Sequence, residues 1–320
     1  MKKGTIIALI VAIALILTGG IILVLGLSFT GDSTQERKLV QQEVTIGESF
    51  DTLEINTADC DVNFAMFSGR DDCMVEIWAH ERVRHSVVVE EGALKIKMID
   101  ERKWTDYIGI FNVLGRTESM RMTVYLPVAE YEALQVRTDT GDITVPEEPF
   151  FREMTLRSDT GDISCTGVSG DVLDCMTSTG DITVQGGTPN LTKLHSNTGD
   201  LKVSVVAGNE LHLQTDTGEV DGENVNVQMF TCSTDSGDVE LEDVLAENYL
   251  QIFTNTGDVG IENCDAGQVN IETDTGDVSG HFLTPKWFSA FSDTGSVRVP
   301  NTPDGGECRI ESNTGSIHFE

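Results

Sequence analysis

The sequence predicts an all-β fold: a single-stranded, right-handed parallel β-solenoid (β-helix) of about ten turns of 19–20 residues, preceded by an N-terminal transmembrane helix. Two observations lead to this prediction. A six-residue phrase, first seen as TDTGDI at Thr138–Ile143, occurs ten times at a nearly constant spacing, and an uncharged, mainly apolar run occupies residues 5–27. So constant a period indicates that each repeat is one turn of a stacked array. The handedness follows from the general preference of parallel connections for the right-handed path.

The glycine of the phrase sets the register of the repeat, because its copies lie 19 or 20 residues apart. Nineteen residues cannot hold a strand together with an ordinary crossover helix, so each turn must consist of strands and corners. We therefore expect these glycines to be structural corner residues with the positive φ that a corner often needs. They are Gly141, Gly161, Gly180, Gly199, Gly218, Gly237, Gly257, Gly276, Gly295 and Gly315.

The apolar residues around each glycine predict which side chains face the core. With the glycine as position 0, positions −7 and −5 are mostly apolar, as Leu134 and Val136 are in the first copy. Position +2 is always Ile, Leu or Val. Alternation along a strand then places −7, −5, −3 and −1 inward, with both Thr/Ser positions of the phrase, and −2 and +1 outward. Buried hydroxyls would pass hydrogen bonds from one turn to the next.

The outward +1 position forms a column of carboxylates, which we name the acidic rib. Asp, Asn and Ser fill the −2 column beside it. Oxygen ligands suit Ca²⁺, so weak association with Ca²⁺ stays open, although no cofactor is predicted and stacking leaves little room for full coordination. The alternative is that these side chains cap backbone N–H groups at their own corners. The acidic rib, our candidate binding surface, consists of Asp142, Asp162, Asp181, Asp200, Glu219, Asp238, Asp258 and Asp277.

The charge of the chain limits its partners. The formal net charge is −32, and the region from Tyr131 onward holds 34 acidic against 8 basic side chains. Such a field repels phosphate backbones, which excludes nucleic acid as an expected partner. The compatible partners are an envelope protein, a cationic peptide or a glycan. Seven cysteines without a CxxC pair argue against a zinc site, although Cys165 could face Cys175 in a disulfide across one turn.

The N-terminus predicts a cell-membrane protein with a single span and an extracytoplasmic C-terminal domain. Lys2 and Lys3 precede the apolar run, which favours an inside N-terminus. As a helix the run would cross a bilayer; a cleaved signal peptide is the alternative. The expected organisation is a cytoplasmic tip (1–4), a transmembrane signal anchor (5–27), a tether (28–49), an N-terminal β region (50–130) and the solenoid repeats (131–320).

Two segments of the N-terminal region stand apart from its alternating strands. Residues 55–62, INTADCDV, look like a degenerate copy of the phrase with Cys60 in the glycine position, so the first coil could begin there. Residues 103–116 place aromatic and aliphatic side chains near one helical face. We expect this segment to cap the open end of the solenoid, and a membrane-surface or partner-binding helix is the alternative. Trp287, Phe288 and Phe291 could do similar work near the other end.

The repeated phrases T-[DNS]-T-G-D-[IV], preceded by TVYLPVAEYEALQV and a membrane anchor, resemble the bacterial "putative adhesin" β-strand-repeat family of unknown function, over roughly residues 50–320. The resemblance implies a β-solenoid of the cell envelope with adhesive or envelope-stress roles, and it carries over no catalytic residue. We therefore expect a non-catalytic extracytoplasmic protein for binding, adhesion or envelope-stress sensing. A carbohydrate-active β-helix enzyme is the alternative, because the rib supplies many carboxylate pairs. Ice binding would need flat, outward Thr columns, which the alternation does not give.

Overall fold

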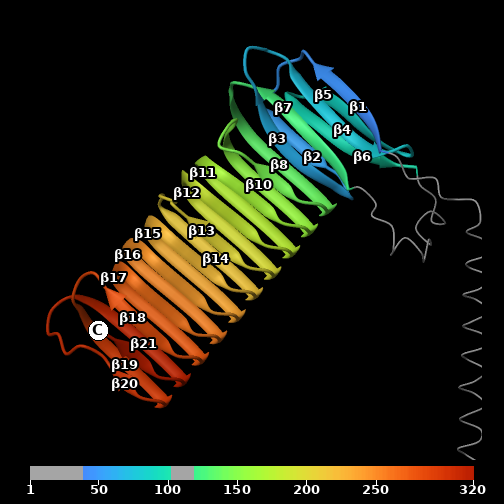
Figure 1. Ribbon diagram of the computed structural model, residues 1–320. Helices are drawn as coiled ribbons and strands as arrows, with labels where there is room; N and C mark the ends of the chain where they lie inside the picture. The colour runs from blue at the N-terminus through green and yellow to red at the C-terminus, as the bar shows by residue number, and fades with distance from the viewer. Residues whose placement is uncertain (1–38, 102–118) are drawn as a thin grey trace, which may run out of the picture. The chain divides into compact units, whose positions relative to one another are not determined.

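The computed structural model describes residues 39–101 and 119–320, which belong to one compact unit, Leu39–Glu320 (Figure 1). In this part of the chain the secondary structure is all β, as predicted, and no helix is long and apolar enough to cross a membrane. The apolar run at 5–27 and the cap segment at 103–116 lie outside the described residues. The strands before the first motif copy are β1 (Leu39–Ile46), β2 (Thr52–Asn56), β3 (Cys60–Phe67), β4 (Cys73–His80), β5 (Val83–Glu90), β6 (Ala93–Asp100) and β7 (Met120–Pro127).

The repeats form the rest of the strands. Several of these run without interruption from one corner to the next, so they bend around most of a coil. They are β8 (Glu130–Thr140), β9 (Ile143–Val145), β10 (Phe150–Thr160), β11 (Ile163–Thr179), β12 (Ile182–Thr198), β13 (Leu201–Ser204), β14 (Glu210–Thr217), β15 (Val220–Ser236), β16 (Val239–Thr256), β17 (Val259–Thr275), β18 (Val278–Phe282), β19 (Lys286–Thr294), β20 (Val297–Arg298), β21 (Gly306–Thr314) and β22 (Ile317–Phe319).

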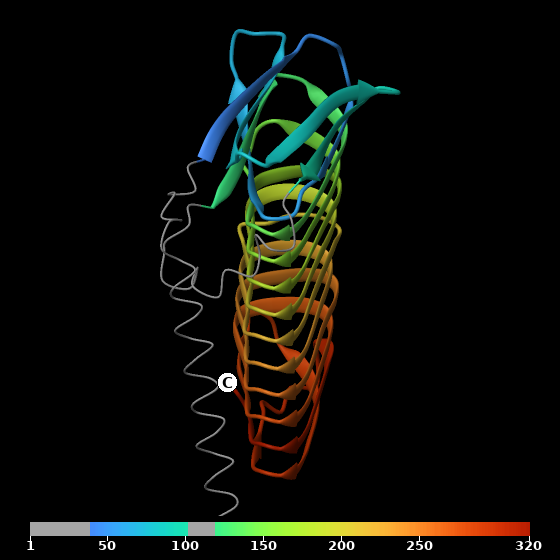
Figure 2. The same ribbon diagram turned by 90° about the vertical axis from the view of Figure 1, so that its right-hand side faces the viewer.

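Successive coils stack by parallel pairing with equivalent residues side by side, which confirms the predicted β-solenoid (Figures 1 and 2). Thr138 pairs with Ser158, for example, and Ser158 pairs with Thr177. At the corner, the N–H of every motif glycine except Gly295 donates to the carbonyl of position −1 in a neighbouring copy, at 2.9–3.0 Å in these nine bonds. In the repeats that the structure describes, the strands pair with those of the neighbouring coils, so the backbone N–H and C=O groups are satisfied between coils.

The core lies inside the coils and is filled by the residues that the alternation predicted. Positions −7, −5 and +2 are buried in every copy except the ninth, whose Val297 is 40% exposed. The long aliphatic columns are possible because like residues stack directly over one another at the strand spacing of about 4.8 Å. Aromatic rings close the two ends of this core, with Phe64 and Phe151 near one end and Phe282 and Phe319 near the other.

A second corner follows six residues after the motif glycine. Gly167 and Gly186 occupy this position with φ of 64° and 75°, and Asn224, Asp243 and Asn263 occupy it with φ of 53–55°. These residue types tolerate the left-handed region well. Val205 occupies the same position, with φ 58°, in the coil between those of Gly186 and Asn224. A β-branched residue is strained there, so this corner is a local weak point of the solenoid.

The first coil in sequence begins at the degenerate copy of the phrase, residues 55–62, as expected. Thr138 Oγ1 donates to the carbonyl of Ala58 at 2.8 Å, and the amide of Asp142 donates to Asp61 Oδ1 at 3.1 Å. The coil made by β2 and β3 stacks on β8 and β9 on one side, and on β6 and β7 on the other. The chain therefore inserts its first coil between two that come later in sequence.

Antiparallel strands cover this end, and we name them the N-terminal cap. β4 pairs antiparallel with β7 and β1, and β5 pairs antiparallel with β6. The expected tether, 28–49, is thus wrong for residues 39–46, because they form β1. Leu39 and Ile46 are buried at its two ends, and the polar residues between them face outward on an edge strand. So few buried positions gave no clear periodicity in the sequence.

The C-terminal end contains a similar exchange. The tenth motif copy stacks directly on the eighth, since the N–H of Gly276 donates to the carbonyl of Thr314 at 2.9 Å. The ninth copy is outermost, because Gly315 donates to Thr294 at 3.0 Å. Strand β21 therefore lies between β17 and β19, and β22 lies between β18 and β20.

Candidate functional site

The corner that carries the acidic rib is built around the motif glycine. All ten motif glycines have φ between 147° and 159°, a range that disfavours other residues. Their backbones also touch from coil to coil. A Cβ added to Gly161 would lie 2.2 Å from the carbonyl oxygen of Gly141, and one added to Gly237 would lie 1.9 Å from that of Gly218. The corner thus requires glycine twice over, for its dihedral angle and for its space.

The corner begins earlier than the alternation predicted. Position −3 is inward, as expected, and its hydroxyls bond the neighbouring coil except at Thr234; Thr177 Oγ1, for instance, donates to the carbonyl of Gly161 at 3.0 Å. Position −1 is exposed in all ten copies, so the prediction that both Thr/Ser positions are buried is wrong for −1. The regular pairing between coils is already interrupted at −2, since −3 and −1 pair with the neighbouring coil and −2 does not, and the side chains at −2 and −1 both point outward. This leaves one exposed Thr column at a corner, beside carboxylates, instead of the flat Thr columns that ice binding needs.

The carboxylates of the acidic rib are tied to the backbone of the neighbouring coil. Asp142 Oδ1 accepts the amide of Asp162 at 2.9 Å, and Asp162 Oδ1 accepts that of Asp181 at 2.8 Å. The same bond recurs from Asp61 to Ser316 with distances of 2.7–3.1 Å. One carboxylate oxygen of each rib aspartate therefore caps a backbone amide, as the capping alternative proposed. The capped amide, however, belongs to the next coil and not to the residue's own corner.

This ladder of carboxylate–amide bonds is interrupted once among the described residues. Glu219 stands where the other coils have Asp, and the amide of Asp238 lacks the equivalent bond. The longer Glu219 side chain lies instead beside Asp221 and Glu240, and oxygens of the three carboxylates lie within 4.8 Å of one another. The charge of Asp221, then burial and the charge of Glu240, raise the pKa of the Glu219 carboxyl above its ordinary value.

The three carboxylates form the one metal-capable cluster of the described residues. Their oxygens could supply part of the coordination shell of a hard cation such as Ca²⁺. Lys202 would compete with a cation for this cluster, because its Nζ already lies 3.2 Å from Asp221 Oδ2. Along the rest of the rib one carboxylate oxygen is already used by an amide. The arrangement therefore suits diffuse attraction of cations along the rib better than a closed cage around one ion.

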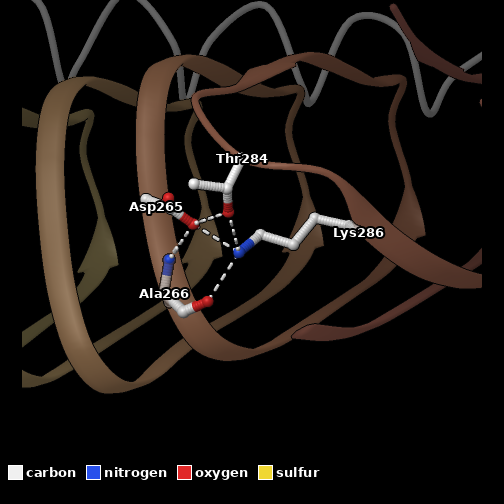
Figure 3. Close-up of polar contacts among 4 residues, drawn as sticks. All are labelled: Asp265, Ala266, Thr284 and Lys286. Carbon is white, nitrogen blue, oxygen red and sulfur yellow. Dashed lines mark hydrogen bonds and ion pairs between the residues drawn. The ribbon is translucent and has the colours of Figure 1, made fainter. Parts of the chain in front are cut away.

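A groove that the sequence analysis missed lies at the C-terminal end of the solenoid. Its volume is about 550 Å³, and it is lined by residues of β15, β16 and β17 together with Thr284, Lys286 and Gly306. Lys286 is buried there, and its ammonium bonds the Asp265 carboxylate, the Ala266 carbonyl at 2.6 Å and the Thr284 hydroxyl at 3.3 Å (Figure 3). These three bonds use all three N–H donors of an ammonium group.

Lys286 therefore holds the exchanged strands together and has no donor left for a substrate. Its side chain reaches Ala266 because Lys286 pairs with Gly306, which itself packs on Gly267, so no side chain stands between. The sequence contained a weak signal for this contact. The position nine residues before the motif glycine is polar in most other coils, whereas the last three copies have Gly267, Lys286 and Gly306 there. That signal could not be interpreted without the exchanged order of the coils.

The cysteines and histidines do not assemble into a reactive site in the part of the chain that the structure describes. All seven cysteines are buried free thiols. Burial raises the pKa of Cys232 to about 12, so its thiolate is scarce at neutral pH. The pKa of the Cys175 thiol is also raised, chiefly by a hydrogen bond with Cys165, so the two sulfurs lie close together, but both are free thiols and do not form the disulfide that the sequence left open. His85 is buried in the N-terminal region, where burial lowers its pKa to about 4.

Comparison with known proteins places the chain in a family. The profile of the Toastrack DUF4097 family matches residues 50–229 and 209–320, and no curated protein sequence matches. A "putative adhesin" from Bacteroides fragilis NCTC 9343 is similar in structure, with 12% identity, a TM-score of 0.44 and coverage of 89% of this chain and 98% of its own. A "putative lipid binding protein" from Parabacteroides distasonis ATCC 8503 has 13% identity, a TM-score of 0.49 and coverage of 88% and 97%.

Such low identities and scores carry no argument about what this chain binds. The family profile is different, because its two matches together span residues 50–320, well over half of the chain. They also cover the repeats whose phrases suggested a repeat family of unknown function, and that resemblance is confirmed. The protein is a member of the Toastrack DUF4097 family.

Proposed function

We propose that the protein is a non-catalytic surface protein of the cell envelope that binds cationic partners along the acidic rib. Residues 5–27 would anchor it in the cell membrane, with the solenoid on the extracytoplasmic side. The observation that carries the proposal is the geometry of the rib. Seven of its eight members are exposed at a corner, and the amide bonds hold most of these carboxylates at fixed positions along the stack.

The spacing of the rib gives it a strong local field. Neighbouring carboxylates about 5 Å apart repel by about 1 kcal/mol in bulk water and about 3 kcal/mol at an effective dielectric of 20. The amide bonds offset part of this repulsion, because each one places a donor against a carboxylate oxygen. The second oxygen of each aspartate stays available, so a partner that brings several positive charges relieves the remaining repulsion.

A basic segment of a peptide or protein is the partner that fits this field best. An extended chain advances about 3.3 Å per residue, so its lysines can follow carboxylates repeated at about 4.8 Å without matching each one. Binding would be dominated by electrostatics and would weaken with salt. Ca²⁺ would share the attraction, with weak affinity, because the rib repeats its ligand geometry without closing a cage.

Calorimetric titration of the full chain in detergent with a lysine-rich peptide tests the proposal. We expect Asp→Asn substitution at Asp142, Asp162, Asp181 and Asp200 to weaken binding about tenfold or more. Asn still offers an oxygen to the neighbouring amide, so the ladder and the melting temperature should be preserved. The matched control removes four exposed charges away from the rib, by Glu→Gln at Glu223, Glu242, Glu247 and Glu262. Equal losses in both variants would mean that net charge, and not the rib, attracts the peptide.

The proposed orientation has its own test. Protease added to intact cells should digest the chain beyond about residue 38, since the solenoid would face outward. The same protease should cut the protein equally after the cells are lysed, which controls for the resistance of the solenoid itself. Protection in intact cells together with cleavage after lysis would place the solenoid inside.

A further inference from the structure

The outermost coil at the C-terminal end has two strands with a free edge, β19 and the two-residue β20. β19 pairs with β21 along one edge, and among the described residues no strand pairs with its other edge. The N-terminal end differs, because the antiparallel strands of the N-terminal cap cover it, and the edge strands of that cap, β1 and β5, carry charged residues. A nine-residue strand with a free edge is a template for pairing with another strand.

The side chains of this edge strand are apolar. Trp287 and Phe291 lie on its outer face with 49% and 59% of their surface exposed. Phe288 and Ala290 face the core but stay half-buried, because no further coil covers them. Natural edge strands are usually protected by charges, bulges, prolines or shortness. β20 is protected by its two-residue length, whereas β19 has a single charged residue at its exposed positions, Asp293.

The exchange of the last two coils determines which strand reaches this edge. The outer face of β21 carries Glu307, Arg309 and Glu311, and the exchange places that strand inside the stack. The acidic rib also stops before the end, because the two outermost coils have Ser296 and Ser316 at the rib position. In a chain of net charge −32, the surface that ends the stack is thus the one with little charge to repel an identical copy.

We propose that β19 pairs with β19 of a second copy of this chain, antiparallel and about a two-fold axis at Ala290. In this register Trp287 lies opposite Asp293 of the other copy, and Phe291 lies diagonally across from its own symmetry mate, within reach of an aromatic side chain. The two Asp293 side chains are separated by about six residues of strand, roughly 20 Å, so they do not repel appreciably. An isologous contact of this kind closes after two copies.

The size of the contact predicts a weak dimer. The exposed parts of Trp287 and Phe291 amount to about 200 Å² per copy. Even with the half-buried core residues and the strand hydrogen bonds, the pair falls at or below the 1,200 Å² or so of the smaller specific interfaces. We therefore expect a dissociation constant in the range of about 10–100 µM. The pairing places the N-terminal caps of the two copies at opposite ends of the dimer.

Sedimentation equilibrium of the full chain in density-matched detergent measures this association over concentrations from about 1 to 200 µM. We expect the wild type to pass from monomer to dimer, and Phe291→Lys to stay monomeric, with association at least about tenfold weaker. The matched control is Met176→Lys, which adds the same charge at an exposed site four residues before the motif glycine of an interior coil. This control should dimerise as the wild type does.

A second variant tests the register. Ala290→Cys lies on the two-fold axis, where facing Cα atoms are about 4.5–5.5 Å apart and a disulfide can form. Mild oxidation should link two copies covalently, and adding Phe291→Lys should prevent the link. A wild type that stays monomeric, masses beyond two copies, or unchanged association of Phe291→Lys would each overturn the proposal. Dimers without a link at residue 290 would overturn the register.

Discussion

Replacing Gly237 with alanine tests the corner on which the stack depends. Gly237 has φ +155°, and an added Cβ would lie 1.9 Å from the carbonyl oxygen of Gly218 and 2.6 Å from its carbonyl carbon. Non-bonded carbon contacts are about 3.5 Å or longer, so the two coils must separate by about 1.5 Å at this corner. Such a shift would also stretch the bonds that Gly237 makes with its neighbours.

The cost has two parts. A non-glycine residue in such a sparsely populated backbone region costs about 1–3 kcal/mol, and overpacking against fixed backbone costs about 1–3 kcal/mol more. We therefore expect Gly237→Ala to lower the free energy of unfolding by about 2–6 kcal/mol. At about 2 °C per kcal/mol for a chain of this size, the melting temperature should fall by roughly 4–12 °C.

Thermal unfolding followed by far-UV circular dichroism measures the shift in the full chain. Gly260→Ala is the matched control, because Gly260 also lies in a coil but has no positive φ, and an added Cβ would approach no atom closer than 4.0 Å. We expect this control to change stability by no more than about 0.5 kcal/mol. Hydrogen exchange should show the loss of protection in Gly237→Ala centred on β15 and β16. Equal melting temperatures for the two variants would refute the argument that contact between coils requires glycine.

Three further predictions concern single residues. Val205→Asn should raise the free energy of unfolding by about 1 kcal/mol in thermal unfolding, because Asn adopts the left-handed conformation that strains Val205. Glu219→Asp should let residue 219 accept the amide of Asp238 and should move its charge away from Asp221 and Glu240. We therefore expect the free energy of unfolding to rise by about 0.5–1.5 kcal/mol. Stability should fall as the pH drops from 6.5 to about 4, because burial lowers the pKa of His85 and only the unfolded chain takes up that proton in this range. His85 should account for roughly 1–3 kcal/mol of the loss, and His85→Gln should remove that share.

Each of these predictions has an outcome that contradicts it. A melting temperature that Val205→Asn leaves unchanged would mean that the second corner carries no strain. Destabilisation by Glu219→Asp would show that the cluster is held together by bound cations or by Lys202 more strongly than its charges repel. An identical pH profile for His85→Gln and the wild type would assign the acid sensitivity to the carboxylates.

The sequence by itself determined the solenoid, because a constant period forces equivalent residues into columns. The spacing of the motif glycines gave the length of a coil, and positions −7, −5 and +2 gave its core. It also gave the acidic rib as an outward column. The sequence could not show where the corner starts, because both Thr positions fit a continuing alternation. Only the packed corner turns the second one outward.

Tertiary structure alone decided the two ends and the order of the coils. The ninth and tenth copies have nearly the same phrase, so nothing local in SDTGSV or SNTGSI tells which one stacks on the eighth. That choice depends on contacts between residues far apart in the chain, such as Lys286 with Asp265 and Gly306 with Gly267. A repeat encodes the interface between neighbours, and this interface is the same for every pair. The ends break the repetition, so their structure depends on the particular side chains that meet there.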